Sequence, residues 1–148
     1  MPLSNDLKEF VELLNSRGVE YVIVEAHSLA FHGRPRYTGD LDVLVRPSPD
    51  NAGKLVDILK QFGFIETEFK ISDFTEPEQI IQLGRSPNRI DLLTSISGVS
   101  INEAFGTKLS AELDGIAVPI LSKAVLIKNK RAVGRPQDLA DIDALREE

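Results

Sequence analysis

Two aspartates one residue apart are the part of this sequence best suited to chemistry. Asp40 and Asp42 stand in "DLDVLV", and residues i and i+2 of a strand project from the same face of a sheet. Two neighbouring carboxylates repel each other unless a cation or a proton compensates, and Mg²⁺ prefers oxygen ligands and bridges to phosphates. The pair therefore indicates either a metal site or a solvated strand edge.

A third carboxylate lies in a similar setting. Asp91 stands in "NRIDLLT" among apolar residues, and a buried strand interior disfavours Asp unless it has a role. If this strand lies beside "DLDVLV", three carboxylates converge on one end of the sheet, as metal-assisted phosphoryl or nucleotidyl transfer requires. The alternative is a turn or capping role for Asp91.

Apolar periodicity and turn residues predict the elements that position these carboxylates. The predicted helices are 5–17, 26–31, 49–62, 102–105, 123–133 and a last one from 136. The predicted strands are 19–24, 40–45, 79–84, 89–94, 108–113 and 116–121, with 64–71 a strand or a loop. Asp114 and Gly115 form a dipeptide favoured in tight hairpin turns. The order predicts an α/β (α+β) fold, with a mixed sheet flanked by helices and two helices at the C-terminus.

Composition restricts the class of protein. The 148 residues suit a single domain spanning 1–148, and the absence of cysteine excludes disulfides and thiolate metal sites. The acidic, broken N-terminus is unlike a signal peptide and no apolar run could span a bilayer, so we expect a cytoplasmic protein without membrane contact. A net charge of −6 argues against broad nucleic-acid binding, although local basic patches exist.

The combined motifs carry a family resemblance. "VEYVIVEAHSLAFHGRPRYTGDLDVLV", "NRIDLLTSISGVSINEAF" and "LIKNKRAVGRPQDLADIDAL" resemble small bacterial nucleotidyltransferase-fold proteins, which are related to polymerase beta and to toxin nucleotidyltransferases. The resemblance spans nearly the whole chain and implies the nucleotidyltransferase fold. It also implies that Asp40, Asp42 and Asp91 are catalytic and bind Mg²⁺ or Mn²⁺ with an NTP, and that Asp91 helps to activate an acceptor hydroxyl.

The same resemblance assigns further residues to the nucleotide site. They are Ala26, His27, Ser28, Arg34, Arg36, Thr38, Lys128 and Lys130. Arginine suits triphosphate oxygens because its planar fork donates hydrogen bonds in pairs. The alternatives are surface ion pairs for the arginines, helix packing or solvation for at least one lysine, and structural roles for His27 and His32.

The sequence departs from the family at one point. Members usually carry Gly-Gly where this chain has Glu25 and Ala26, because glycine lets the backbone approach the triphosphate. Ala26 adds one methyl group. Glu25 adds bulk and a negative charge, and two like charges about 4 Å apart repel by about 4 kcal/mol at an effective dielectric of 20. Pairing with Arg34 or Arg36, binding to the metal, or facing away would each relieve this repulsion.

Three functions therefore stay open. The first is a Mg²⁺-dependent nucleotidyltransferase that moves NMP from an NTP to a hydroxyl of a protein, an RNA or a small molecule, as one component of a toxin–antitoxin pair or outside such a pair. The second is a degenerate, non-catalytic module that binds a partner. The third is a metal-binding or interaction domain without nucleotide chemistry. A small chain leaves little room for an acceptor-binding domain, so a partner protein or a homodimer could complete the site.

Overall fold

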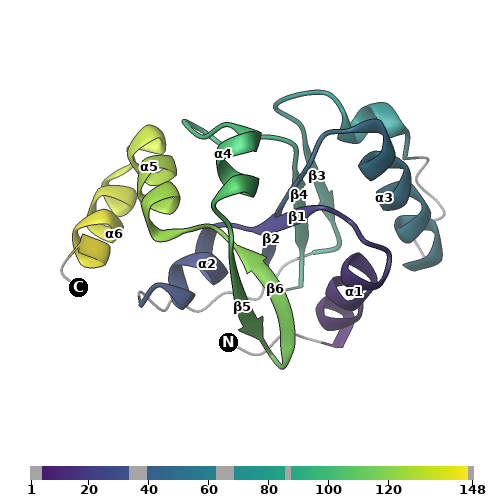
Figure 1. The fold of residues 1–148 in the computed structure, drawn as a ribbon, viewed down its shortest axis with the longest axis horizontal. Coiled ribbons are helices and arrows are strands. Elements are labelled where there is room, and N and C mark those ends of the chain that lie inside the picture. Colours follow the sequence, from purple (N-terminus) through teal and green to yellow (C-terminus); the bar gives the residue numbers. More distant parts are fainter. Residues whose placement is uncertain (1–4, 34–39, 63–68, 86–87, 147–148) are drawn as a thin grey trace.

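The computed structural model describes residues 5–33, 40–62, 69–85 and 88–146. A six-stranded mixed sheet forms its centre, with the strand order β3-β4-β2-β1-β6-β5. Helices cover both faces of this sheet (Figure 1). The strands are β1 (Tyr21–Ile23), β2 (Leu41–Val45), β3 (Ile80–Leu83), β4 (Ile90–Leu93), β5 (Leu109–Leu113) and β6 (Ile116–Ile120).

Strand direction varies across the sheet. The central strand β2 runs antiparallel to β1 and parallel to β4, whereas β3–β4 and β5–β6 are antiparallel hairpins. The β5–β6 hairpin turns at Asp114 and Gly115, with φ values of 51° and 81°. Positive φ at both central residues is the requirement of a type I′ turn, which confirms the hairpin predicted from this dipeptide.

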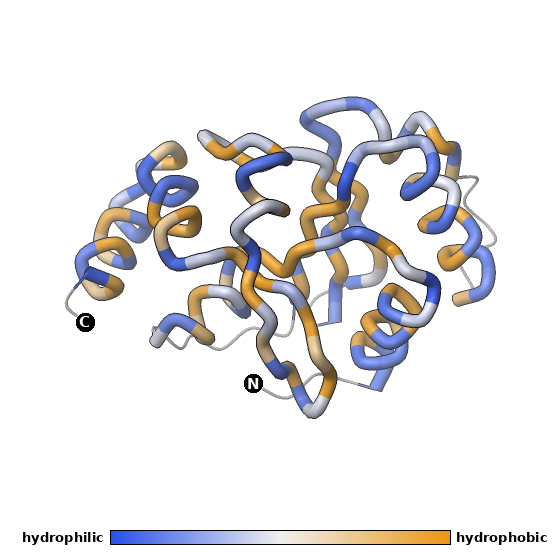
Figure 2. Tube along the Cα trace, viewed as in Figure 1, coloured by the Kyte–Doolittle hydropathy of each residue, from blue (hydrophilic) through white to orange (hydrophobic). Residues whose placement is uncertain are grey.

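One face of the sheet is covered by α1 (Asn5–Ser16) and α3 (Pro49–Phe62). Both helices bury an apolar stripe that includes Phe10 and Leu59 against the odd-numbered residues of β2, namely Leu41, Val43 and Val45. Alternation along the strand thus sends these three side chains away from Asp42. Figure 2 shows hydrophobic stretches along the central strands and alternating hydrophobic and hydrophilic residues along the helices.

The opposite face is covered by α2 (Glu25–Phe31), α4 (Ile101–Gly106) and α5 (Lys123–Val133). Leu29, Leu44 and Leu126 share a second apolar cluster there. The last helix, α6 (Pro136–Arg146), packs against α5 rather than on the sheet. Asp42 lies on the Leu44 side of β2, so the carboxylates lie on the sheet face covered by α2, α4 and α5.

The predicted class is confirmed, with differences in detail. A 3₁₀ helix, η1 (Ile71–Phe74), follows the segment predicted as a strand or a loop, of which residues 63–68 lie outside the described ranges. Strand β1 is three residues long rather than six, and α2 begins at Glu25, one residue earlier than predicted. None of the helices in the described part of the chain combines the length and the apolar character needed to cross a bilayer.

Candidate active site

The strand that carries Asp91 lies directly beside the strand that carries Asp42. Strands β2 and β4 are parallel, and their register places Asp42 opposite Asp91. Asp40 precedes β2, and its Oδ1 accepts a hydrogen bond of 3.0 Å from the Arg89 amide. The three carboxylates therefore meet at one end of two neighbouring strands, as the sequence predicted. We call Asp40, Asp42 and Asp91 the strand carboxylates.

An arginine lies among the strand carboxylates. The Nε and Nη2 of Arg89 donate to the two carboxylate oxygens of Asp91 at 2.8 and 3.2 Å, and Nη2 lies 3.8 Å from Oδ2 of Asp40. Such bidentate pairs are among the strongest charge-assisted hydrogen bonds. Their charge also raises the pKa of the guanidinium, mainly through the bond to Asp91. Arg89 thus supplies one positive charge to three carboxylates.

Asp42 has the most perturbed carboxyl of the three. Burial, followed by the charges of Asp91 and Glu25, raises its pKa to about 7. Burial and like charge thus outweigh the opposing effect of Arg89 on this carboxyl. Strongly perturbed acids of this kind concentrate at functional sites.

The charge of Glu25 acts on this cluster. Glu25 begins α2 at a φ of 56°, in the left-handed region that favours glycine. Its charge contributes to the raised pKa of Asp42, after the larger effects of burial and of Asp91. The same charge raises the pKa of Arg135, after the larger effect of Asp138. Where the resemblance expects glycine, this chain therefore has a backbone conformation that favours glycine but a residue with a charged side chain.

The donor set suits a divalent cation by its chemistry. Carboxylate oxygens are the ligands that Mg²⁺ prefers, and three carboxylates gather where burial and then like charge raise the pKa of Asp42. In this structure the carboxylates of Asp40 and Asp91 are oriented toward Arg89 rather than toward a common metal position. Within the described ranges no three acidic or histidine side chains form a group able to hold a metal ion. A cation bound by all three carboxylates would therefore have to share Asp91 with Arg89, or take it from Arg89.

The predicted nucleotide residues fall into different environments. Arg34, Arg36 and Thr38 lie outside the described residues. Ser28 is fully buried, and its hydroxyl has no hydrogen-bond partner in the described structure.

His27 is buried beside a cavity of about 140 Å³ between α2 and the β5–β6 hairpin, and burial lowers its pKa. Neither ring nitrogen of His27 has a hydrogen-bond partner in the described structure. His32 contacts the carbonyl of Leu121 at 2.7 Å at the end of α2, which confirms its predicted structural role.

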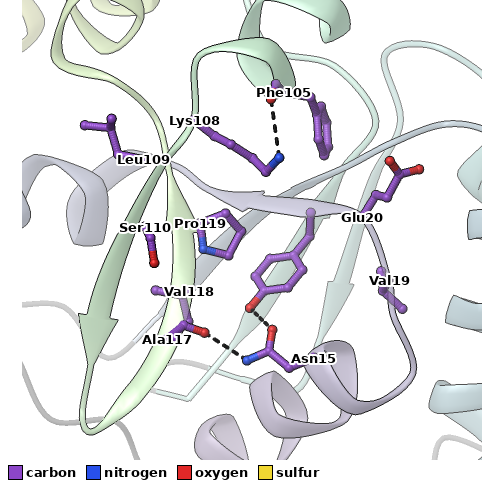
Figure 3. A pocket seen from close by; sticks show the side chains of 11 residues that line it. Asn15, Val19, Glu20, Phe105, Lys108, Leu109, Ser110, Ala117, Val118 and Pro119 are labelled. Atoms are coloured by element: carbon purple, nitrogen blue, oxygen red, sulfur yellow. Dashed lines mark hydrogen bonds between the residues drawn. The ribbon is translucent and has the colours of Figure 1, made fainter.

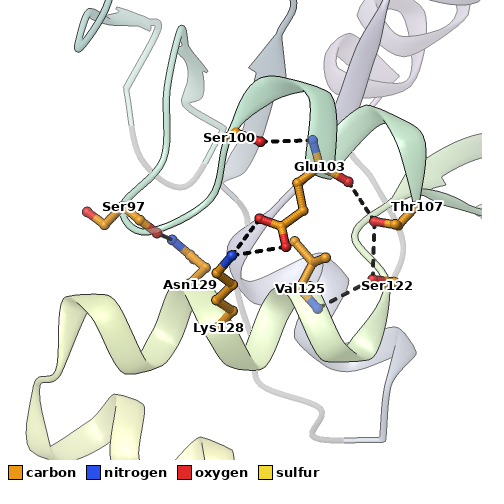
Figure 4. A network of polar contacts seen from close by, with 8 residues as sticks. All are labelled: Ser97, Ser100, Glu103, Thr107, Ser122, Val125, Lys128 and Asn129. Atoms are coloured by element: carbon orange, nitrogen blue, oxygen red, sulfur yellow. Dashed lines mark hydrogen bonds and ion pairs between the residues drawn. The ribbon is translucent and has the colours of Figure 1, made fainter.

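The two predicted lysines both have carboxylate partners. Lys128 donates to Glu103 of α4 at 2.8 and 3.0 Å on the surface, within a polar network that joins α4 to α5 (Figure 4). Lys130 is buried between Asp138 and Asp141, at 3.3 and 3.2 Å. This burial favours a structural role for Lys130 over phosphate binding.

Sequence reasoning missed two features of this region. The first is the role of Arg89, although an arginine two residues before a strand aspartate projects on the same side as that aspartate. The aspartates in "GRPQDLADIDAL" were assigned only to a helix, although Asp138 and Asp141 are spaced i, i+3 and so share one helix face. Both spacings are visible in the sequence, but the ion pairs that these residues form are known only from the tertiary structure.

A second cavity lies at the other end of β1. Its volume is about 450 Å³, and Tyr21, Lys108 and Pro119 are among its lining residues (Figure 3). The Tyr21 hydroxyl donates to Asn15 at 2.7 Å, and the Lys108 amine donates to the Phe105 carbonyl at 3.4 Å. Tyr21 pairs with Val45 at the far end of β2, so this cavity is separate from the strand carboxylates.

Comparisons with known proteins identify the fold. No protein-family model and no curated protein sequence matches the chain. The lincosamide antibiotic adenylyltransferase LnuA, solved with lincomycin, matches with a TM-score of 0.63 at 13% identity, over 99% of this chain and 98% of LnuA. TM1012 of Thermotoga maritima, described as a nucleotidyltransferase, matches with a TM-score of 0.60 at 16% identity, over 95% and 88%. The antibiotic-resistance factor ANT(2'')-Ia matches with a TM-score of 0.56 at 12% identity, over 95% and 79%. The chain therefore has the fold of these nucleotidyltransferases.

Proposed function

We propose that the protein is a nucleotidyltransferase that moves NMP from an NTP to an acceptor hydroxyl. The observation that carries the proposal is the pairing of Asp42 with Asp91 on adjacent parallel strands, with Asp40 beside them, in a nucleotidyltransferase fold. Apolar residues would pack better than carboxylates at these three positions, so packing does not explain the acids. Their position fits phosphoryl-type chemistry.

The roles follow from the contacts. Asp40, Asp42 and Asp91 would hold Mg²⁺ or Mn²⁺, which supplies the positive charge that phosphate oxygens need during transfer. Asp91 is the residue that we assign to orient and deprotonate the acceptor hydroxyl. Ala26 and Ser28 belong to the helix that follows β1, and Arg34, Arg36 and Thr38 complete the proposed nucleotide-binding group.

The acceptor is a hydroxyl of a protein, an RNA or a small molecule. Two of the structural neighbours are an adenylyltransferase for lincosamide antibiotics and an antibiotic-resistance factor, which makes small-molecule hydroxyls the first class to screen. A toxin–antitoxin role would instead require a protein or RNA acceptor. Transfer of label from an alpha-labelled NTP to each class separates these alternatives.

The test is pyrophosphate release from ATP, GTP, CTP and UTP with Mg²⁺, across acceptor pools of the three classes. We expect release with one NTP and one pool, and we expect Asp42→Asn to reduce the rate at least about a hundredfold. Asp57→Asn is the matched control, because Asp57 is exposed on α3 across the sheet. Equal rates for wild type and Asp42→Asn would remove Asp42 from the mechanism.

A second candidate is a non-catalytic module that binds nucleotide weakly or not at all and acts through a partner protein. Glu25 favours it, since its charge adds to the negative charge around Asp42, where a triphosphate would approach. Thermal shift with each NTP, with and without Mg²⁺, separates the two. A shift that appears only in Glu25→Gly supports the second candidate, and a shift in wild type supports the first.

A further inference from the structure

Arg89 connects the strand carboxylates in two ways. Its backbone joins β4 to β2, because its amide donates to Asp40 and its carbonyl accepts from the Leu41 amide at 2.9 Å. Its side chain then folds back over the same strands to reach Asp91 and Asp40. One residue therefore adds two hydrogen bonds between the starts of β2 and β4 and places a positive charge among their acids.

The guanidinium uses the oxygens that a divalent cation would use. Both oxygens of Asp91 accept from Arg89, at 2.8 and 3.2 Å, and Asp91 is nearly buried with 7% of its surface exposed. A carboxylate so enclosed has few other directions from which to bind a second cation. Arg89 and a metal ion therefore compete for Asp91.

The side chain of Arg89 is free to yield in this competition. It is 33% exposed, whereas the Asp91 side chain is 9% exposed. The backbone bonds to β2 do not depend on where the guanidinium points, so the strands stay joined if it swings into solvent. The backbone contacts of Arg89 therefore do not require its guanidinium to stay on Asp91.

We propose that Arg89 is a positioning residue that holds Asp91 and Asp40 as an internal cation and releases Asp91 when a divalent cation binds. The inference rests on the proposed metal site and adds that the Arg89 side chain competes with the metal ion for Asp91. Metal affinity is then lower than the three carboxylates alone would give, and the protein keeps its acids in place before metal arrives.

The test is direct Mn²⁺ binding, measured by electron paramagnetic resonance of free Mn²⁺, without nucleotide or turnover. We expect Arg89→Gln to bind Mn²⁺ about tenfold more tightly than wild type, because a neutral side chain no longer competes. Arg89→Lys keeps the charge but loses the fork, so it should fall between the two. Arg46→Gln is the matched control, since Arg46 is 30% exposed and pairs with Glu20 at 3.1 Å at the other end of β2.

A second measurement uses the wild type alone. The Arg89 Nε–H signal in nitrogen-edited NMR should shift on titration with Mg²⁺, at the same metal concentration at which the Asp42 and Asp91 amides shift. An Arg89 signal that stays fixed while those amides move overturns the competition. This readout holds even if the Arg89 variants do not fold.

The outcomes separate this inference from the proposed function. Tighter binding in Arg89→Gln, abolished by adding Asp91→Asn, supports both. Equal or weaker binding in Arg89→Gln, with wild-type binding still dependent on Asp91, overturns the role of Arg89 and leaves the metal site standing. Absence of Mn²⁺ binding in both wild type and Arg89→Gln overturns the metal site and the inference with it.

Discussion

Two acidic clusters in this protein have opposite electrostatics. The strand carboxylates share one partly exposed guanidinium, and the pKa of Asp42 is raised to about 7. The helix ion cluster, formed by Lys130, Arg135, Asp138 and Asp141 of α5, α6 and the turn between them, gives two cations to two acids. There the bond from Arg135, with help from Lys130, lowers the pKa of Asp138 to about 2.

The difference separates acids that are compensated by cations of the same chain from acids that are not. In the helix ion cluster every charge lies next to its opposite, so it is compensated from within the chain. The strand carboxylates carry more negative charge than Arg89 can compensate, so a further cation or proton stabilises them. Glu25 lies within electrostatic reach of Asp42 and of Arg135, and it makes this imbalance larger.

The largest expected effect comes from breaking the compensated cluster. Lys130→Met leaves two acids buried without their shared amine, and we expect the free energy of unfolding to fall by about 3–5 kcal/mol. Urea denaturation followed by circular dichroism measures this. Lys128→Met is the control, because the Lys128 side chain is 53% exposed rather than 4%, and should cost less than about 1 kcal/mol. Equal losses in both variants would contradict the contrast between the clusters.

A smaller effect is expected in the pH dependence of stability. The folded state holds a proton on Asp42 more tightly than the unfolded state, so its contribution is fully present below pH 3.8 and is lost as pH rises through about 7. We expect wild type to lose on the order of 2 kcal/mol over this window relative to Asp42→Asn, with the coupling to Asp91 reducing the ideal value. Urea denaturation at pH 4, 5.5, 7 and 8 measures the difference.

Asp138 should behave in the reverse sense. Its lowered pKa gives stability that is present above pH 3.8 and lost as pH falls through about 2. Asp138→Asn should therefore be destabilised at neutral pH, where Asp42→Asn is stabilised. The same sign of change in both variants would contradict the assignment of the two clusters to opposite classes.

The smallest effect concerns Glu25. Glu25→Gly removes a side chain from a φ of 56° and a charge from the vicinity of Asp42, so we expect the free energy of unfolding to rise by about 1 kcal/mol. Glu78→Gly is the matched control, because Glu78 has a φ of 60° and is exposed. Glu25→Gln keeps the backbone strain and removes the charge. If Glu25→Gly gains no more than Glu78→Gly, the charge of Glu25 contributes nothing to stability.

Much of the fold followed from local patterns. The helix that begins at Pro49 and the hairpin at Asp114 and Gly115 were predicted because capping, periodicity and turn residues act over a few positions. The 3₁₀ helix at Ile71–Phe74 was not predicted, because no periodic pattern marks so short an element. The departure at Glu25 was also visible in sequence, although its positive φ was not.

The candidate site was only partly predictable. Asp40, Asp42 and Asp91 could be proposed as a group, because acids in apolar strands demand an explanation. The role of Arg89 could not, because it depends on the register of β2 against β4. Lys130 was assigned to phosphate and lies in a buried ion cluster instead, because the packing of α6 against α5 decides its partners.

The sequence by itself therefore determined which residues carry charge into apolar segments, and on which face of each strand or helix they lie. Those properties depend on chemical type and on periods of two or 3.6 residues, which are local. Only the tertiary structure decided which charges meet. Residues 42 and 91 become neighbours through a parallel strand pairing, and the sign of each pKa shift is set by the distances and burial that such long-range contacts create.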